Sequence, residues 1–228
     1  MEKGTLFGVG IGPGDSDLIT LKAAKIISEC NYIATPETGT SDSLALSIVS
    51  NAIDLSQKEI MGLSFPMTKD KDILAKSHKE AAESIMEILD SGNDVAMLNL
   101  GDVTIYSTFA YIMDILLEKG YDVEVIPGIT SFCASASQLK ISLTTMNEPL
   151  HLIPATGIDI MEALELSGTK VFMKIGRSMP KLIECLRELN LKDNVYAVEN
   201  CGLENEKIYW GLDEFDSKMG YFTIVVVK

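Results

Sequence analysis

The sequence predicts an α/β protein of two α/β domains, with a largely parallel sheet in the first domain and a mixed sheet in the second. Short apolar runs alternate with segments of helical periodicity through the first half, which is typical of βαβ units. Apolar runs follow one another more closely in the second half, and 228 residues are enough for two compact domains. We expect the boundary near residue 120, giving domains of residues 1–120 and 121–228.

Strands are predicted in the first part of the chain where short apolar runs precede turn residues, at 5–9, 32–34, 95–100 and 123–126. The second of these is expected to stop before Pro36, because proline cannot donate to a sheet. Helices are predicted where apolar residues recur at helical spacing, at 21–29, 43–52, 73–89, 107–119 and 131–139. Thr20 is the expected N-cap of the first helix, and Gly92 and Gly120 are expected to end two others.

The second part of the chain predicts strands at 150–154, 170–175, 194–198 and 221–227, and helices at 158–166 and 178–189. In the last helix Ser178 is the expected N-cap, with Pro180 in the first turn. Residues 223–227 (TIVVV) are continuously apolar or β-branched, which predicts a buried strand.

Composition excludes several classes of function. The formal net charge of −14 disfavours nucleic-acid binding, because an acidic surface repels phosphates. No apolar run approaches the roughly 18 residues of a membrane span. The first residues lead directly into a predicted strand without the features of a signal peptide, so we expect a cytoplasmic protein. A mean hydropathy of +0.19 fits either a well-filled core or a subunit interface.

The cysteines and histidines do not form a metal-binding pattern. Cys30, Cys133, Cys185 and Cys201 are widely scattered, which predicts reduced thiols rather than disulfides. The chain has only two histidines, and they are far apart in the sequence. We therefore expect no protein-bound metal.

Three glycine-rich turns follow predicted strands and are the strongest indication of a binding site. The first turn is residues 8–15 (GVGIGPGD), the second turn is residues 100–108 (LGDVTIYST) and the third turn is residues 125–131 (VIPGITS). Glycine allows a backbone to approach a ligand closely, and open α/β sheets bind ligands at turns that leave buried strands. The turns therefore predict one composite pocket for a small polar molecule.

The first turn does not fit a dinucleotide-binding fingerprint. In the G-x-G-x-x-G spacing the third glycine would fall at Pro13 or Asp15. Pro13 has no N–H to offer a pyrophosphate, and Asp15 and Asp17 add negative charge where phosphates would bind. A Walker pattern is also absent. The turns favour a ligand without phosphates, and a cationic ligand fits them.

Taken together, the three turns resemble the S-adenosylmethionine-dependent tetrapyrrole methylases. The first turn, followed by residues 18–23 (LITLKA), is similar to the opening motif of that family. The second turn resembles the second motif, with Val103 where the family usually has proline, and the third turn resembles the third motif. The resemblance extends over essentially the whole chain. It implies two α/β domains with S-adenosylmethionine in the cleft between them, and a homodimer.

One branch of the family is most similar to this chain, namely the enzymes that methylate C20 of precorrin-2 or of its cobalt-containing counterpart, cobalt-factor II. The resemblance lies in residues 65–70 (FPMTKD), 81–82, 173–177 (MKIGR) and 198–208 (VENCGLENEKI). It implies a C-methyltransferase of cobalamin (vitamin B12) biosynthesis. We favour the cobalt-containing substrate.

The resemblance also implies which residues contact the methyl donor: Pro13, Leu100, Gly101, Asp102, Ile105, Thr130, Ser131, Lys174 and Cys201. Other roles are open on the residues alone. Asp102 could be a turn aspartate, and Thr130 and Ser131 could only start a helix. Lys174 could be a surface lysine and Cys201 a core cysteine.

The donor's methyl group is activated on sulfonium, so direct in-line displacement needs positioning above all. A base could remove the C20 proton afterwards, and Tyr106, His151 and Glu199 are candidates that the sequence does not separate. Arg177 follows Gly176 at a predicted strand end and is the candidate for binding a substrate carboxylate, because guanidinium suits bidentate pairing.

Other functions remain open at this point. Another tetrapyrrole methylase, such as the uroporphyrinogen III methylase, would share all three turns, as would a noncatalytic module that binds S-adenosylmethionine. A nicotinamide oxidoreductase is disfavoured by Pro13 and Asp15.

Overall fold

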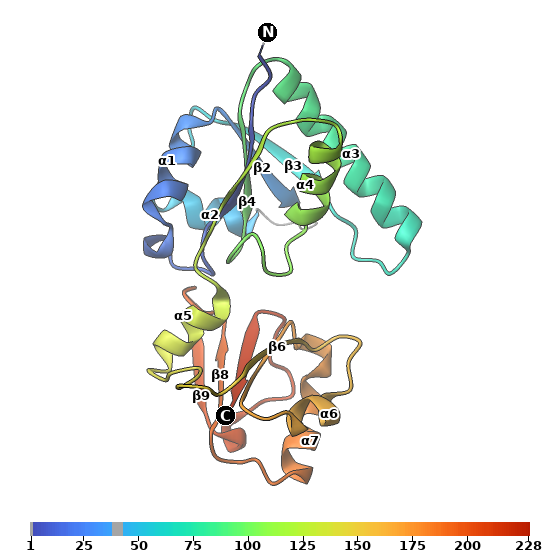
Figure 1. The fold of residues 1–228 in the computed structure, drawn as a ribbon. Helices are drawn as coiled ribbons and strands as arrows, with labels where there is room; N and C mark the ends of the chain where they lie inside the picture. Colours follow the sequence, from blue (N-terminus) through green and yellow to red (C-terminus); the bar gives the residue numbers. More distant parts are fainter. Residues whose placement is uncertain (1, 38–42) are drawn as a thin grey trace. The chain divides into compact units, whose positions relative to one another are not determined.

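The structure is a computed structural model that describes residues 2–37 and 43–228. It divides into two compact units, Met1–Thr130 and Ser131–Lys228, which we describe separately (Figure 1). The division falls later in the chain than the expected position near residue 120. The reason is that β5 (Val123–Ile126) pairs in parallel with β1 (Leu6–Gly10) and therefore belongs to the first sheet.

In the described part of the first unit, five strands form one sheet in the order β3-β2-β4-β1-β5. Its other strands are β2 (Tyr32–Glu37), β3 (Glu59–Ser64) and β4 (Val95–Asn99). Every neighbouring pair is parallel, as the alternation of strands and helices predicts. Because all strands run the same way, the turns that follow β1, β4 and β5 leave the sheet at one edge, its carboxyl edge.

Helices cover both faces of this sheet (Figure 1). On one face lie α1 (Leu21–Glu29) and α2 (Leu44–Ser50), and on the other lie α3 (Lys71–Asp90) and α4 (Phe109–Glu118). The predicted N-cap of α1 is confirmed, since the Thr20 hydroxyl accepts a hydrogen bond from the Ala23 N–H at 3.1 Å. The predicted stops are also confirmed, because Gly92 and Gly120 have positive φ just after α3 and α4.

The second unit contains a mixed sheet in the order β6-β7-β10-β8-β9. The strands are β6 (Leu150–Pro154), β7 (Thr169–Met173), β8 (Val195–Glu199), β9 (Lys207–Trp210) and β10 (Thr223–Val227). Only β6 and β7 are parallel among the pairs described, and the other pairs are antiparallel. The central β10 is buried at every position, which confirms the prediction from its β-branched run.

The helices of the second unit are α5 (Ser131–Gln138), α6 (Ile160–Glu165) and α7 (Met179–Glu188). Figure 1 shows α6 and α7 together on one face of the sheet, and their apolar side chains join its core. Ser178 precedes α7 as expected, but its hydroxyl does not cap the helix. It donates instead to the Ala155 carbonyl oxygen at 2.9 Å and so ties the helix start to the end of β6.

Three features of the strands differ from the sequence prediction. Strand β2 continues through Pro36 to Glu37 instead of stopping before the proline. It pairs with β4 only as far as Ala34, so Pro36 lies where one flank of the strand is unpaired and a missing N–H is tolerated. Strands β3 and β9 were not predicted. Both are edge strands with many exposed positions, and β3 contains Gly62, so neither has the pattern of a buried strand.

Candidate functional site

The three glycine-rich turns meet at the carboxyl edge of the first sheet. Gly12 of the first turn and Gly101 of the second turn form an antiparallel bridge. The Gly101 N–H donates to the Gly12 carbonyl at 2.8 Å, and the Gly12 N–H donates to the Gly101 carbonyl at 3.3 Å. Both residues have positive φ, 79° and 71°, which explains why glycine is needed at these positions. The bridge fixes the first two turns relative to each other.

The third turn packs directly on the other two through glycines. A Cβ atom placed on Gly10 would lie 2.6 Å from the Gly128 nitrogen and 2.9 Å from the Gly101 carbonyl oxygen. A Cβ atom on Gly128 would in turn collide with the same Gly101 oxygen. The absence of side chains at Gly10 and Gly128 therefore allows three backbones to touch, independently of any ligand.

Asp102 links the second turn to the third. Its Oδ2 accepts a hydrogen bond from the Gly128 N–H at 2.8 Å, and its Oδ1 accepts from the Thr104 N–H at 2.8 Å and from the Thr104 hydroxyl. Burial alone would raise the pKa of the carboxyl, but the hydrogen bonds from Thr104 and Gly128 outweigh burial, and the pKa lies below its usual value. Asp102 is therefore a carboxylate at neutral pH.

Two further side chains, those of Asn99 and Ser107, hold the beginning and the end of the second turn together. The Ser107 hydroxyl donates to Oδ1 of the buried Asn99 at 2.6 Å, and the same hydroxyl accepts from the Phe109 N–H at 3.1 Å, which starts α4. Between these anchors, Leu100 and Ile105 are half-buried. Tyr106 is exposed and has a φ of 50°, which is uncommon for a residue with a side chain.

The first turn offers backbone polar groups and one carboxylate, that of Asp15. Pro13 is half-buried in it, and the Asp15 carboxylate accepts a hydrogen bond from the Asp17 N–H at 2.9 Å. Asp15 thereby caps the short 3₁₀ helix η1 (Ser16–Leu18). The three turns contain no lysine or arginine, while Asp15 and Asp102 are acidic. Acidic residues without any neighbouring lysine or arginine in the turns suit a ligand that carries positive charge and no phosphate.

Thr130 and Ser131 are the last two residues of the third turn and are both half-buried. Thr130 is the last residue of the first unit, and Ser131 is the first residue of the second unit and of α5. The structure thus brings together Pro13, Leu100, Gly101, Asp102 and Ile105 at one sheet edge, with Thr130 at the end of the third turn.

The predicted site residues of the second unit lie at the ends of its strands. Lys174 directly follows β7, is half-buried and has a φ of 54°. Cys201 follows β8 and is buried. Arg177 is exposed in η2 (Gly176–Ser178), while Arg187, the other arginine, is exposed within α7. Their roles in binding stay predictions.

Two of the candidate bases are occupied by contacts within the second unit. The Glu199 carboxylate accepts from the Gly220 N–H at 2.6 Å and from the Tyr209 hydroxyl at 3.1 Å. His151 lies on the edge strand β6, and its Nε2 is 2.9 Å from the Ser167 carbonyl oxygen. Glu199 of β8 is thus bound to the loop residue Gly220, and His151 of β6 to the loop residue Ser167, so each side chain helps to hold a strand against a neighbouring loop.

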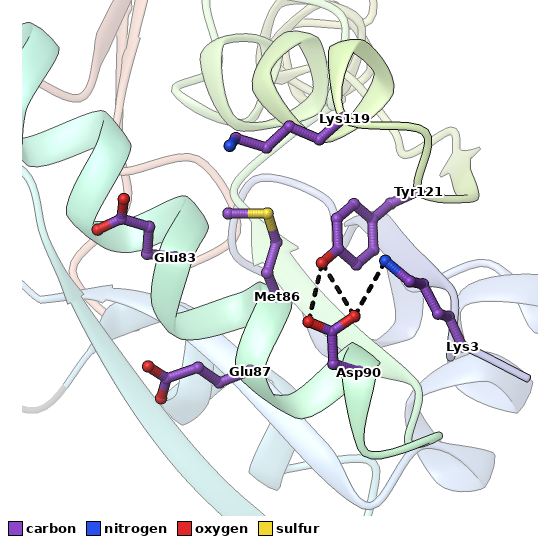
Figure 2. A pocket seen from close by; sticks show the side chains of 7 residues that line it. All are labelled: Lys3, Glu83, Met86, Glu87, Asp90, Lys119 and Tyr121. Carbon is purple, nitrogen blue, oxygen red and sulfur yellow. Dashed lines mark hydrogen bonds and ion pairs between the residues drawn. The ribbon is translucent and has the colours of Figure 1, made fainter. Parts of the chain in front are cut away.

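A separate cavity of about 550 Å³ lies in the first unit at the opposite, amino-terminal edge of the sheet (Figure 2). Its residues end α3, follow α4 or precede β1 and β5. Figure 2 shows the Tyr121 hydroxyl and the Lys3 ammonium converging on the Asp90 carboxylate. The Tyr121 hydroxyl donates to both Asp90 oxygens at 3.0 Å, and the Lys3 nitrogen lies 3.0 Å from one of them. Because these groups neutralise one another and lie away from the glycine-rich turns, we assign the cluster a structural role.

Within residues 2–37 and 43–228, no three histidine, cysteine or acidic side chains gather closely enough to hold a metal ion. Among the helices described, none is long and apolar enough to cross a membrane.

Comparison with known proteins identifies the family. A family model of the tetrapyrrole (corrin/porphyrin) methylases matches residues 5–216.

The chain belongs to the tetrapyrrole methylases.

Two curated relatives of this methylase match it almost from end to end. A probable cobalt-precorrin-2 C(20)-methyltransferase from Methanocaldococcus jannaschii is 34% identical, over 98% of this chain and 95% of the relative. A precorrin-2 C(20)-methyltransferase from a Sinorhizobium species is 28% identical, over 98% of this chain and 95% of the relative.

A solved structure confirms the predicted α/β fold of the methylase. The uroporphyrin-III C-methyltransferase of Thermus thermophilus, complexed with S-adenosyl homocysteine, superposes with a TM-score of 0.72 at 19% identity. The match covers 98% of this chain and 91% of that structure. At this identity the likeness concerns the fold alone.

Sequence reasoning did not single out three residues that hold the turns of the methylase, namely Asn99, Thr104 and Gly128. Asn99 could have been noticed as a polar residue that ends an otherwise apolar strand. The glycine at 128 follows Pro127 in a turn, but its contact with Gly10 depends on strand order, which the sequence does not display.

Proposed function

We propose that this protein transfers a methyl group from S-adenosylmethionine to C20 of precorrin-2, in its cobalt-containing form, during cobalamin biosynthesis. The observation that carries the proposal is the end-to-end similarity to the C(20)-methyltransferase of M. jannaschii, at 34% identity. Similarity over whole chains supports a shared reaction more strongly than similarity confined to one turn. The metal-free substrate named for the Sinorhizobium relative is the alternative.

The residues of the three turns fit S-adenosylmethionine. The donor carries a sulfonium and an ammonium group and has no phosphate. The turns offer backbone polar groups, contain the acidic residues Asp15 and Asp102, and have no lysine or arginine. A phosphorylated ligand would meet Asp15 and Asp102 and no compensating cation. The relative from Thermus thermophilus, whose fold is shared, was solved with S-adenosyl homocysteine, the demethylated donor.

S-adenosylmethionine supplies a methyl group that is already activated on sulfonium, and C20 of the macrocycle is the carbon nucleophile. The C–S bond breaks as the new C–C bond forms, and C20 later loses its proton. The protein contributes chiefly by holding the two reactants in line. Such positioning can lower the activation barrier by roughly 7 kcal/mol or more in the most favourable cases. In this chain the rigid junction of Gly10, Gly101 and Gly128 would provide that positioning on the donor side.

Arg177 is our candidate for binding a substrate carboxylate. It is exposed in η2, which lies between β7 and α7, whereas Arg187 is exposed within α7, so the second arginine offers a matched control. We expect Arg177→Ala to raise the Michaelis constant for the tetrapyrrole about tenfold, because one charge-assisted hydrogen bond of roughly 1.5 kcal/mol is lost. The Michaelis constant of Arg187→Ala should equal that of the wild type. An unchanged Michaelis constant in Arg177→Ala would exclude this role.

The decisive experiment incubates the purified protein with methyl-labelled S-adenosylmethionine and, in parallel, cobalt-loaded precorrin-2, metal-free precorrin-2 and uroporphyrinogen III. Label transferred to C20 of the cobalt-loaded substrate supports the proposal. Preferred transfer to metal-free precorrin-2 would reassign the substrate, and preferred transfer to uroporphyrinogen III would reassign the enzyme. Donor binding without transfer to any tetrapyrrole would indicate a noncatalytic module.

Two further expectations accompany the proposal. We expect a homodimer, which light scattering of the purified protein tests, and we expect the enzyme to act in the cytoplasm. The participation of Thr130, Ser131, Lys174 and Cys201 in donor binding also stays a prediction, to be tested by substitution of each residue.

A further inference from the structure

The carboxylate of Asp102 is already committed to the protein. A carboxylate has about four acceptor positions, and three of those of Asp102 are taken by the Thr104 N–H, the Thr104 hydroxyl and the Gly128 N–H. The residue is only 8% exposed. The charged group that the sequence offers most prominently to a cationic ligand is thus turned inward.

The bond to Gly128 lies at the point where the three turns touch. The Gly128 backbone lies against the Gly101 oxygen and the backbone of Gly10, so closely that no side chain would fit. The first and second turns are held together by their own backbone bridge. The first and third turns are also linked, because β1 pairs with β5 as far as Val9 and Ile126. Among the hydrogen bonds described, the one from Gly128 to Asp102 joins the third turn to the second.

An ionised carboxylate suits this role better than any neutral side chain. It accepts from donors on both oxygens at once, and bonds to a charged acceptor are stronger than neutral ones. An asparagine of the same shape would have to point an N–H group at one of these donors. Because Thr104 supplies two donors and Gly128 one, the amide oxygen keeps more bonds by facing Thr104. The NH2 group would then face the Gly128 N–H, and the bond from the third turn to the second would be replaced by a repulsive contact.

We propose that Asp102 is a positioning residue that locks the third turn onto the second, and that its carboxylate does not bind the methyl donor directly. This inference rests on the proposed function, because it assumes that the three turns hold S-adenosylmethionine. Asp102 then acts through the placement of Gly128, and its removal affects any ligand of the turns, whatever the charge of that ligand.

The first test compares donor and product affinities by calorimetry. S-adenosylmethionine carries the sulfonium charge, and S-adenosylhomocysteine lacks it. We expect Asp102→Asn to weaken both ligands by the same factor, about tenfold for one lost charge-assisted hydrogen bond. Weakening of S-adenosylmethionine alone would show a direct charge contact and would overturn the proposal, as would unchanged affinity for both ligands.

Asp94→Asn is the matched control. The Asp94 carboxylate also accepts from a backbone N–H, that of Thr5 at 2.7 Å, but at the amino-terminal edge of the same sheet. We expect this variant to be less stable yet to bind both ligands like the wild type. An equal loss of affinity in Asp94→Asn would show that general destabilisation explains the effect of Asp102→Asn, and would overturn the proposal.

The second test needs no ligand. Hydrogen exchange of the Gly128 amide in the ligand-free protein should accelerate about tenfold in Asp102→Asn, while an unchanged rate would overturn the proposal. Thr104→Val removes one donor to the same carboxylate and provides a milder variant should Asp102→Asn fold poorly, and Thr104→Ser should restore wild-type exchange. If the wild type bound neither ligand, the proposed function would be wrong. The exchange rate of the Gly128 amide would still test whether Asp102 holds the third turn on the second.

Discussion

Replacing Gly10 by alanine should separate the three turns without straining the backbone of residue 10. Gly10 is not one of the glycines with positive φ, so alanine can adopt its conformation. The new Cβ would nevertheless lie 2.6 Å from the nitrogen and 2.8 Å from the Cα of Gly128, and 2.9 Å from the Gly101 oxygen. All of these are backbone atoms, which cannot rotate away as a side chain would.

The size of the effect follows from these distances. Reaching an ordinary separation of about 3.5 Å requires the third turn to move by roughly 1 Å. Overpacking of this kind costs about 1–3 kcal/mol of folding free energy. A displacement of about 1 Å in a positioning element lowers catalytic efficiency about 100-fold. We therefore expect kcat/KM to fall by about two orders of magnitude while the protein remains folded.

Gly120→Ala is the control for this variant. Gly120 has a φ of 77° and no atom within 4 Å of a built Cβ, so alanine there costs backbone strain, roughly 1–2 kcal/mol, without a clash. Urea unfolding should show similar losses of stability in the two variants, whereas methyl-transfer assays should show a loss of kcat/KM only in Gly10→Ala. Wild-type kcat/KM in Gly10→Ala would refute the reasoning, since the turns would then tolerate separation.

Two further predictions concern the first unit. The ring of His78 stacks on Tyr111 with 4.5 Å between the ring centroids, and burial lowers the pKa of His78. The imidazole of His78 therefore binds a proton more readily in the unfolded chain than in the folded one. The stability that the neutral ring contributes is complete above the unfolded pKa of about 6.5 and is lost as the pH falls below it. Urea midpoints compared at pH 7.5 and 5 should therefore decrease less in His78→Phe than in the wild type, and an equal decrease would contradict this. Thr20→Ala should lower the free energy of unfolding by about 1 kcal/mol through loss of the α1 cap, with Thr20→Ser close to wild type, and an unchanged unfolding curve for the alanine variant would show that the cap contributes nothing.

The elements that the sequence predicts well are those with a strong local signal. The helix at 21–29 has a capping threonine and an amphipathic pattern, and α1 has the same bounds in the structure. Strand β10 is a continuous β-branched run and is buried throughout. Strands β3 and β9 escape prediction although the edge strands β5 and β6 were predicted, so an edge position alone is not the reason. Gly62 interrupts the apolar residues of β3, and no position of β9 is fully buried.

The candidate site was predictable as a set of turns but not as a network of contacts. The glycines marked the turns correctly, yet a glycine pattern cannot tell which partner requires the missing side chain. At Gly8 that partner is the Phe109 ring of α4, into which a Cβ would project, and at Gly10 it is Gly128. Asp102 shows the same limit, because an aspartate after glycine suggests a ligand contact until its partners are known.

The charge of the chain places a constraint on where the tetrapyrrole is recognised. The substrate proposed here carries several carboxylates, while the protein has a net charge of −14 and no lysine or arginine in the three turns. These turns therefore suit the cationic donor and repel the anionic acceptor, which favours separate recognition of the two substrates. The cations that meet the acceptor have to come from outside the turns. Of the two arginines, only Arg177 follows a strand end in a short 3₁₀ helix, which is why we test it first.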